Sequence, residues 1–225
     1  MVYFQVQRAQ VIDGQQSHAH TRTNMTNASP DDSRVRSAES LAAAAAWPNG
    51  TLEVICGPMF AGKTSLLIAR LAAAKARGQS VAAFKHASDT RYHATHLATH
   101  DGQQIAAMAV ADPIELFARL GKAQVVAIDE VHFFGAWLWD IIVPILRDRR
   151  TLIVAGVERD HVGRPFEPFP RLLVEADTVT KLGGPCKKCG KPAIHSQRMS
   201  EDASRVVVGG SELYQARCRE CFGKP

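Results

Sequence analysis

Long apolar runs are missing from the 225-residue sequence, and none reaches the roughly 18 residues of a membrane-spanning helix. The start of the chain lacks the basic segment and apolar core of a secretory signal, and acidic residues such as Asp13 and Glu39 are unusual in an organelle-targeting peptide. Only five cysteines are present, four of them in two Cys-x-x-Cys pairs, which favours a metal site in a reducing compartment over disulfides. These absences predict a cytoplasmic protein with no membrane partner.

Large apolar residues are scarce before residue 50, where Gln, Ser, Ala, Thr and Asn are frequent. Such a segment buries too little surface to offset its loss of conformational entropy, so we expect residues 1–49 to be a disordered extension. The formal net charge of +5 arises after this segment, which itself contains four basic and four acidic side chains. An excess of this size suits a polyphosphate ligand, but without a clustered basic face it does not predict nucleic acid as a partner.

A phosphate-binding loop is predicted where the sequence reads Gly-x-x-x-x-Gly-Lys-Thr, between a strand-like run at 52–56 and a helical pattern at 65–77. The glycines let the backbone turn its N–H groups toward an anion at the positive end of the helix. The lysine supplies charge for the β- and γ-phosphates, and the threonine hydroxyl is a ligand for Mg²⁺. We therefore expect a nucleoside triphosphate to bind here. The loop consists of Gly57, Pro58, Met59, Phe60, Ala61, Gly62, Lys63 and Thr64.

The apolar run at 124–128 ends in two carboxylates, Asp129 and Glu130. Such a run is typical of a buried parallel strand, and ligands of open α/β sheets bind at the carboxyl ends of the strands. Asp129 is then placed to hold Mg²⁺, directly or through water, and Glu130 to take a proton from the phosphoryl acceptor. The alternative is a helix cap that exposes both acids to solvent.

Strand-like and helical segments alternate from residue 51 to 156, which predicts an α/β fold with a doubly wound parallel sheet. Between them, the polar segment 85–104 is expected to be a long loop, and the proline-rich connector 157–171 is expected to contain no helix. The expected strands are 52–56, 80–84, 124–130, 151–156 and 179–182, and the expected helices are 65–77, 112–120 and 137–149.

The two Cys-x-x-Cys pairs predict a zinc site, because each pair brings two thiolates to one ion and two pairs complete a tetrahedron. The 28 residues between the pairs must hold a hairpin or a loop, and segment 205–210 reads as a strand followed by a turn. Free thiols or disulfides remain the alternative. The lone Cys56 is expected to be a small core residue. The metal ligands would be Cys186, Cys189, Cys218 and Cys221.

Taken together, these motifs resemble those of type II thymidine kinases, over roughly residues 51 to 222. The resemblance implies a P-loop kinase domain at 50–182 and a small zinc-ribbon-like domain at 183–225, which carries a lasso-like flap. The matching segments are 57–64, 84–85 (Phe-Lys), 89–92 (Asp-Thr-Arg-Tyr), 99–102 (Thr-His-Asp-Gly), 129–130, 133–134 (Phe-Phe), 165–166 (Pro-Phe), 179–182 (Val-Thr-Lys-Leu), the four cysteines, 208–210 (Val-Gly-Gly) and Tyr214.

The resemblance also implies transfer of the γ-phosphoryl group of ATP to the 5′-hydroxyl of thymidine, with Mg²⁺, by a homotetramer with structural Zn²⁺. It places Glu130 as the catalytic base. The implied nucleotide-site residues beyond the loop are Asp89, Arg91, Asp129, Glu130, Val131 and His132. The implied nucleoside enclosure comprises Met59, His161, Ser196, Arg205, Val206, Val207, Val208, Gly209 and Tyr214.

Three positions depart from the pattern of that family. His132 stands where glutamine is usual, His161 where a phenylalanine stacks on the base, and Ser196 where threonine is common near the thymine methyl group. Imidazole buries less apolar area than a phenyl ring, so nucleoside affinity is expected to fall. A changed preference between thymidine and deoxyuridine is the resulting hypothesis.

Two other classes of protein share single features with this chain. Asp-Glu-Val-His at 129–132 also matches the box of nucleic-acid helicases, although the chain has no room for a second motor domain. A zinc-ribbon nucleic-acid module joined to an NTPase is the other alternative, and it depends only on the cysteines and the basic charge. Phosphorylation of free thymidine without nucleic acid would exclude both.

Overall fold

A computed structural model describes residues 50–89, 95–98, 102, 104–202 and 204–223. The extension predicted at 1–49 and the expected site residue Arg91 lie outside the described residues. His93 and His100 share helical spacing with His96 but have no carboxylate partner in register for a metal site, and they also lie outside the described residues.

The centre of the fold is a six-stranded sheet, all of whose neighbouring strands are parallel. Its strand order, β5-β2-β6-β7-β1-β8, places the strand before the glycine-rich loop two positions from the strand that ends in Asp129. The strands are β1 (Thr51–Cys56), β2 (Val81–His86), β5 (Met108–Val110), β6 (Val125–Asp129), β7 (Thr151–Gly156) and β8 (Thr178–Lys181).

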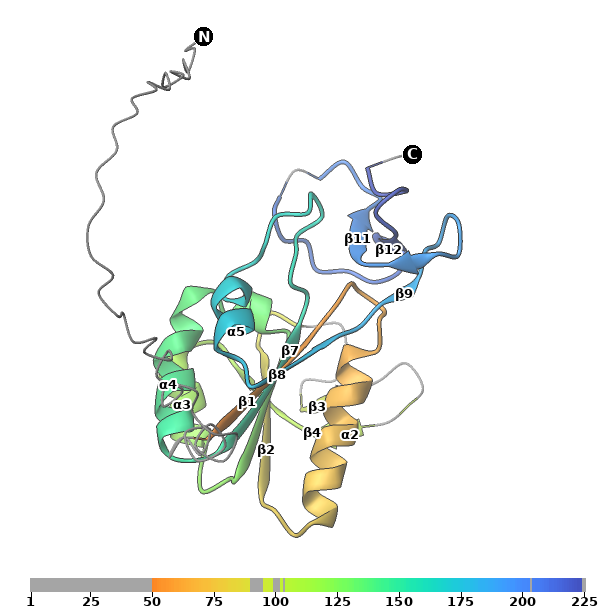
Figure 1. The fold of residues 1–225 in the computed structure, drawn as a ribbon. Helices are drawn as coiled ribbons and strands as arrows, with labels where there is room; N and C mark the ends of the chain where they lie inside the picture. The colour runs from red at the N-terminus through yellow and green to blue at the C-terminus, as the bar shows by residue number, and fades with distance from the viewer. Residues whose placement is uncertain (1–49, 90–94, 99–101, 103, 203, 224–225) are drawn as a thin grey trace, which may run out of the picture. The chain divides into compact units, whose positions relative to one another are not determined.

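Helices cover both faces of this sheet, as the alternating pattern predicted (Figure 1). On one face, α2 (Lys63–Ala76) buries Leu67 and Leu71 against β1, β6 and β7. On the other face, apolar residues of α3, α4 and α5 form a second core with Val54 and Phe84. These helices are α3 (Pro113–Arg119), α4 (Trp139–Arg147) and α5 (Phe169–Glu175).

Local sequence signals explain how two of these elements begin or pack. The N-cap of α3 is Asp112, whose Oδ1 accepts a hydrogen bond from Glu115 N at 2.8 Å, and Pro113 follows at the first helical position. Cys56 is fully buried at the end of β1, also as predicted, and burial raises the pKa of its thiol to about 11. This thiol is therefore an unreactive part of the core.

The connector after β7 was expected to contain no helix, and this was wrong. Helix α5 begins at Phe169 and includes Pro170 in its first turn, where the missing proline N–H has no helical partner to lose. Apolar Phe169 and Leu172 bury the helix against the sheet, and this burial outweighs the proline content.

The polar segment after β2 contains more structure than the loop that was expected. It holds an antiparallel pair, β3 (His96–Ala98) with β4 (Gln104–Ala106), followed directly by sheet strand β5.

Short single-turn helices follow β6, namely η2 (Val131–Phe133) and η3 (Ala136–Leu138).

The C-terminal segment is built from short hairpins around the cysteines. Strands β9 (Gly184–Pro185) and β10 (Pro192–Ala193) pair, and β11 (His195–Arg198) pairs with β12 (Tyr214–Arg217). The second hairpin spans the gap between the two cysteine pairs, as predicted. The strand expected at 205–208 is absent: these residues belong to a segment without helix or strand.

Within the part of the chain that the structure describes, no helix is both long and apolar enough to cross a bilayer.

Candidate active site

The glycine-rich loop joins β1 to α2 in the turn that the sequence predicted. Gly57 has a φ of 148°, and a Cβ atom there would lie 2.4 Å from the carbonyl oxygen of Leu182. Gly62 has a φ of 84° directly before the helix, a backbone conformation that side chains with a Cβ disfavour. The two glycines therefore let the backbone curl closely at each end of the loop.

Lys63 lies inside this curl rather than in solvent. Its side chain is only 7% exposed, and its Nζ donates a hydrogen bond to the carbonyl oxygen of Pro58 at 2.8 Å. A buried ammonium group beside the N-terminus of α2 gives the loop a concentrated positive potential. This is the electrostatic setting that a phosphate chain requires.

The loop and the end of β6 meet at one hydrogen bond. The Thr64 hydroxyl donates to Asp129 Oδ2 at 2.8 Å, across 65 residues of sequence. Burial, followed by the neighbouring Glu130 carboxylate, raises the pKa of Asp129 to about 7, although the Thr64 hydrogen bond opposes this rise. A hydroxyl and a buried carboxylate in contact are oxygen ligands that suit Mg²⁺, whose charge would favour the ionised form of Asp129.

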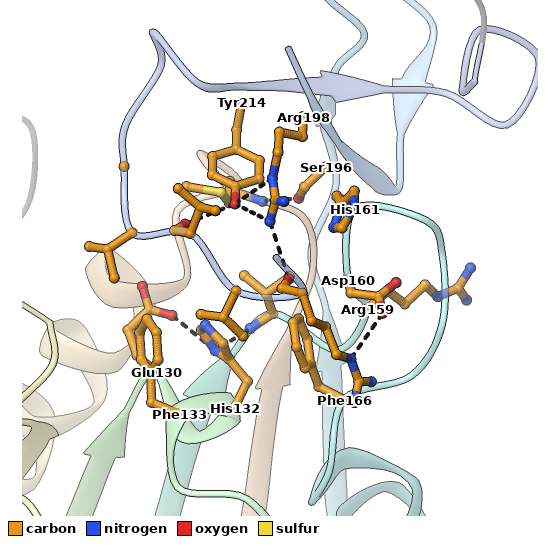
Figure 2. A pocket seen from close by; sticks show the side chains of 17 residues that line it. Glu130, His132, Phe133, Arg159, Asp160, His161, Phe166, Ser196, Arg198 and Tyr214 are labelled. Atoms are coloured by element: carbon orange, nitrogen blue, oxygen red, sulfur yellow. Dashed lines mark hydrogen bonds and ion pairs between the residues drawn. The ribbon is translucent and has the colours of Figure 1, made fainter. Parts of the chain in front are cut away.

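Glu130 is held in a backbone conformation that non-glycine residues seldom adopt. Its φ is 51°, and Asp129 Oδ1 accepts a hydrogen bond from its backbone N–H at 2.9 Å. Strained positions of this kind cost about 1–3 kcal/mol and gather at functional sites. The turn directs the buried carboxylate away from the strand, with Oε2 lying 3.4 Å from His132 Nδ1 (Figure 2).

A cavity of about 910 Å³ lies over the carboxyl ends of the strands. The glycine-rich loop, the acidic pair and the end of β2 all line this cavity. An open α/β sheet predicts this position for a ligand site, at the carboxyl ends of its strands. Its lining includes Met59, Phe60, Gly62, Lys63, Thr64, Lys85, Asp89, Asp129 and Glu130.

A second and smaller cavity, of about 50 Å³, lies on the other side of Glu130. One side is formed by the connector after β7, and the other by a segment that we call the flap, residues 204–213 (Figure 2). Glu130 and Met59 line both cavities, so the acidic pair faces the larger cavity and Glu130 also reaches the smaller one.

Arg198 organises the base of the flap. Its guanidinium group donates to Tyr214 Oη at 3.0 and 3.2 Å, to the carbonyl oxygen of Asp202 at 2.8 Å, and to the carbonyl oxygens of Ser204 and Arg205. Tyr214 Oη in turn donates to the carbonyl oxygen of Val207 at 2.8 Å. A flap without secondary structure is thereby given a defined path by one buried arginine.

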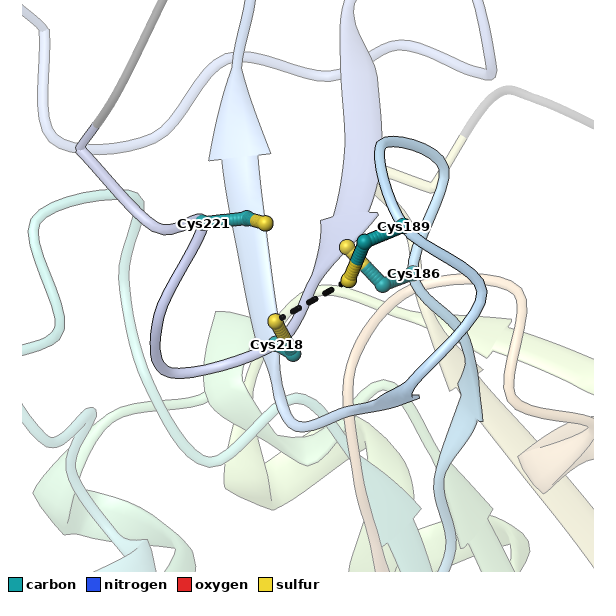
Figure 3. Close-up of side chains that lie close together, drawn as sticks. All are labelled: Cys186, Cys189, Cys218 and Cys221. Carbon is teal, nitrogen blue, oxygen red and sulfur yellow. Dashed lines mark hydrogen bonds between the residues drawn. The ribbon is translucent and has the colours of Figure 1, made fainter.

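The four cysteines of the two pairs converge on one point (Figure 3), with all sulfur atoms within 4.8 Å of one another. The Sγ atoms of Cys189 and Cys218 are 3.6 Å apart. Burial opposes ionisation of Cys186, but hydrogen bonds from the backbone of Cys218, Lys188 and Cys189 prevail and lower its pKa to about 6. Four thiols in this arrangement, one of them readily ionised, could hold a tetrahedral metal ion.

A family model described as thymidine kinase matches residues 50–222. This match spans almost all of the described residues, including both cavities and the cysteines. The chain belongs to the thymidine kinase family.

Curated relatives agree with this membership. The chain is 42% identical to a thymidine kinase of a Rhodothermus species over 78% of this chain and 83% of that protein. It is 42% identical to a thymidine kinase of Halobacterium salinarum over 77% of this chain and 94% of that protein. A thymidine kinase of Bacteroides thetaiotaomicron is 38% identical over 77% and 87% of the two chains. A solved DNA replication initiation factor, 16% identical with a TM-score of 0.36 over 59% of this chain and 40% of that one, is too dissimilar to bear on function.

The residues that the thymidine kinase resemblance implied for the nucleoside all line the smaller cavity. Of those implied for the nucleotide, Gly57, Pro58 and Ala61 belong to the loop but do not line the larger cavity. Val131 is fully buried in the core, so its side chain cannot reach a ligand. His132 lines the smaller cavity, not the larger one.

Sequence reasoning missed Arg198 and Asp160 near the cavities, and it named Lys85 only as part of the Phe-Lys segment of the resemblance, without a role. Lys85 is 2% exposed at the end of β2 and donates to the carbonyl oxygen of Asp89 at 3.3 Å. Arg198 shapes the flap through the carbonyl groups of Asp202, Ser204 and Arg205 nearby in the sequence. Asp160 holds the turn of the connector and meets Arg205 45 residues further along the chain. For Lys85, its position after the apolar run of β2 could have served as the signal, whereas nothing local marks the other two.

Ser196 joins the C-terminal segment to the glycine-rich loop, because its hydroxyl accepts a hydrogen bond from Met59 N at 2.9 Å. We expect Ser196→Ala to lower the free energy of unfolding by about 1–2 kcal/mol, since the partly buried amide loses its acceptor. Ser196→Thr keeps the hydroxyl and serves as the matched control. Urea unfolding of both variants checks this, and equal stability of Ser196→Ala and wild type would contradict it.

Proposed function

We propose that this protein transfers the γ-phosphoryl group of ATP to the 5′-hydroxyl of thymidine and so forms thymidine monophosphate. The observation that carries the proposal is the meeting of the loop with the acidic pair, seen in the Thr64–Asp129 hydrogen bond, in a chain of the thymidine kinase family. Glu130 lies where the two cavities adjoin, which is where a phosphoryl donor and its acceptor would meet.

In this reaction the oxygen of the 5′-hydroxyl forms a bond to the γ-phosphorus, and the bond from that phosphorus to the bridging oxygen of ADP breaks. Glu130 accepts the hydroxyl proton, and its Oε2 lies 3.4 Å from His132 Nδ1. Phosphoryl transfer depends mainly on positioning and on charge neutralisation, and Lys63 would supply a buried ammonium group to the phosphates.

The nucleotide and its metal fit the residues that are present. The glycine-rich loop would hold the phosphates, with Asp89 and Arg91 as further polar groups. Thr64 and Asp129 would hold Mg²⁺, which neutralises phosphate charge when bound.

The smaller cavity is the proposed nucleoside site. Met59 and Tyr214, with the backbone of the flap, would enclose the base, and His161 and Ser196 would lie against it. Enclosure by the flap excludes water, which would otherwise compete as phosphoryl acceptor.

We further propose a division into a kinase domain at 50–182 and a zinc domain at 183–225, with Zn²⁺ on the four cysteines. A cytoplasmic location and a homotetrameric assembly are proposed from the composition and from the family, with no nucleic acid as partner.

We expect Glu130→Gln to lower kcat for thymidine phosphorylation by about 10²–10⁴-fold, because the amide cannot accept the proton. Binding of ATP should be retained, since the loop and Asp129 are unchanged. Glu175→Gln, in an exposed ion pair of α5, is the matched control and should turn over normally. A nucleoside panel with ATP and Mg²⁺ measures all three proteins, and near-normal turnover of Glu130→Gln would refute its role as the base.

The wild-type protein, with His161, should select thymidine over deoxyuridine less strongly than a variant with phenylalanine at this position. We expect His161→Phe to raise kcat/KM for thymidine over that for deoxyuridine by about threefold to tenfold, through added apolar contact with the base. Steady-state kinetics with both nucleosides tests this. An unchanged ratio would remove the hypothesis that His161 affects selectivity.

Zinc should be necessary for the C-terminal fold. We expect Cys221→Ser to lose bound zinc and to lower Tm by about 5–10 °C, because metal binding contributes directly to folding. Cys56→Ala is the control that should keep its zinc, since Cys56 belongs to the core of the sheet. Metal analysis with thermal unfolding measures both effects, and full zinc content in Cys221→Ser would contradict this assignment.

A further inference from the structure

Arg205 of the flap contacts the connector on the opposite side of the smaller cavity. This contact combines an ion pair, a hydrogen bond and a cation–π interaction. Arg205 Nε lies 3.1 Å from Asp160 Oδ2, and Arg205 Nη2 donates to the carbonyl oxygen of Pro165 at 2.7 Å. The same guanidinium lies 4.9 Å from the ring centroid of Phe166. Arginine is suited to this combination, because its planar fork can donate in two directions while it stacks on an aromatic ring.

Asp160 is held in place by hydrogen bonds that do not involve Arg205. Its side chain is 1% exposed, and its Oδ1 accepts hydrogen bonds from Val162 N at 3.2 Å and Arg164 N at 2.8 Å. Asp160 N also donates to the carbonyl oxygen of Arg164 at 2.8 Å, which closes the turn. One carboxylate oxygen therefore holds the connector in shape, and the other accepts the flap arginine.

We propose that Arg205 is a positioning residue, whose ion pair with Asp160 latches the flap closed over the nucleoside. This inference rests on the proposed function, because it takes the smaller cavity as the nucleoside site. Arg198 plays a different part, because it shapes the flap from within the C-terminal segment, whereas Arg205 joins the flap to the connector that follows β7.

The size of the smaller cavity shows why a latch would matter. At about 50 Å³ the cavity in this closed arrangement has room for only a few water molecules, so the flap must shift to admit a nucleoside. Opening separates Arg205 from a buried carboxylate that keeps only backbone donors. Loss of this ion pair on opening favours the closed arrangement. A bound nucleoside would therefore dissociate more slowly than it would from a protein without the ion pair.

The test uses the full-length protein with three substitutions. Arg205→Gln removes the charge, and Arg205→Lys keeps the charge but not the fork. Arg164→Gln is the matched control, since it removes an exposed arginine near the same turn, while the hydrogen bonds that Arg164 makes with Asp160 run through its backbone.

Hydrogen exchange of the ligand-free proteins is the first readout, because it needs no activity. We expect amide exchange in residues 204–213 to rise by about tenfold in Arg205→Gln, less in Arg205→Lys and not in Arg164→Gln. Unchanged exchange in Arg205→Gln would overturn the latch. This holds even if wild type fails to phosphorylate thymidine, which would overturn the proposed function alone.

Kinetics is the second readout. With saturating ATP, we expect the KM for thymidine to rise by about fivefold to tenfold in Arg205→Gln, while kcat and the KM for ATP stay within about twofold. The dependence of that KM on salt should also be weaker than in wild type, because an ion pair has been removed. An unchanged or lower KM would overturn the proposal, and a lower KM would mean that the contact hinders entry instead.

Discussion

The hydrogen bond between the Thr64 hydroxyl and the Asp129 carboxylate is the contact on which the site depends. It joins the first residues of α2 to the end of β6, two segments that the parallel sheet brings to the same edge. Parallel strands place all their carboxyl ends together, so a loop after one strand and two acids after another must face a common space. The larger cavity is that space.

Burial gives this contact its chemical character. Lys63, Asp129 and Glu130 are each less than a tenth exposed, in surroundings where charge interactions are much stronger than in water. Burial and the neighbouring Glu130 carboxylate raise the pKa of Asp129 to about 7, so a cation bound beside it would favour its ionised form. The phosphates of a triphosphate would complement the positive loop, and the accompanying cation would complement the two carboxylates. The phosphates alone or the cation alone would match only one of the two.

The C-terminal segment forms one side of the smaller cavity and is held there by a few specific contacts. Ser196 ties it to the glycine-rich loop, Arg198 shapes the flap, and Arg205 reaches the connector. The flap has neither helix nor strand, so its path is determined by side-chain hydrogen bonds to its carbonyl groups rather than by backbone pairing. Such a segment can move without disturbing the sheet.

The sheet, the loop and the cysteine cluster could be predicted because each has a local signal: alternating apolar segments, glycine spacing and paired cysteines. Helix α5 could not, because its helical character comes from burial of Phe169 and Leu172 rather than from propensity. The strand expected at 205–208 was wrong for the opposite reason, since valine-rich sequence favours strands but no partner strand lies beside it among the described residues. Asp160 meets Arg205 across 45 residues and Arg198 meets Tyr214 across 16, and neither spacing is a recognised sequence motif.

The most direct measurement follows the label from ATP carrying a labelled γ-phosphate, incubated with the protein, Mg²⁺ and thymidine in the absence of nucleic acid. If one site joins the phosphate loop, the acidic pair and an enclosed nucleoside, the label appears in thymidine 5′-monophosphate. Label found only in inorganic phosphate, with a yield that rises when nucleic acid is added, would contradict this account.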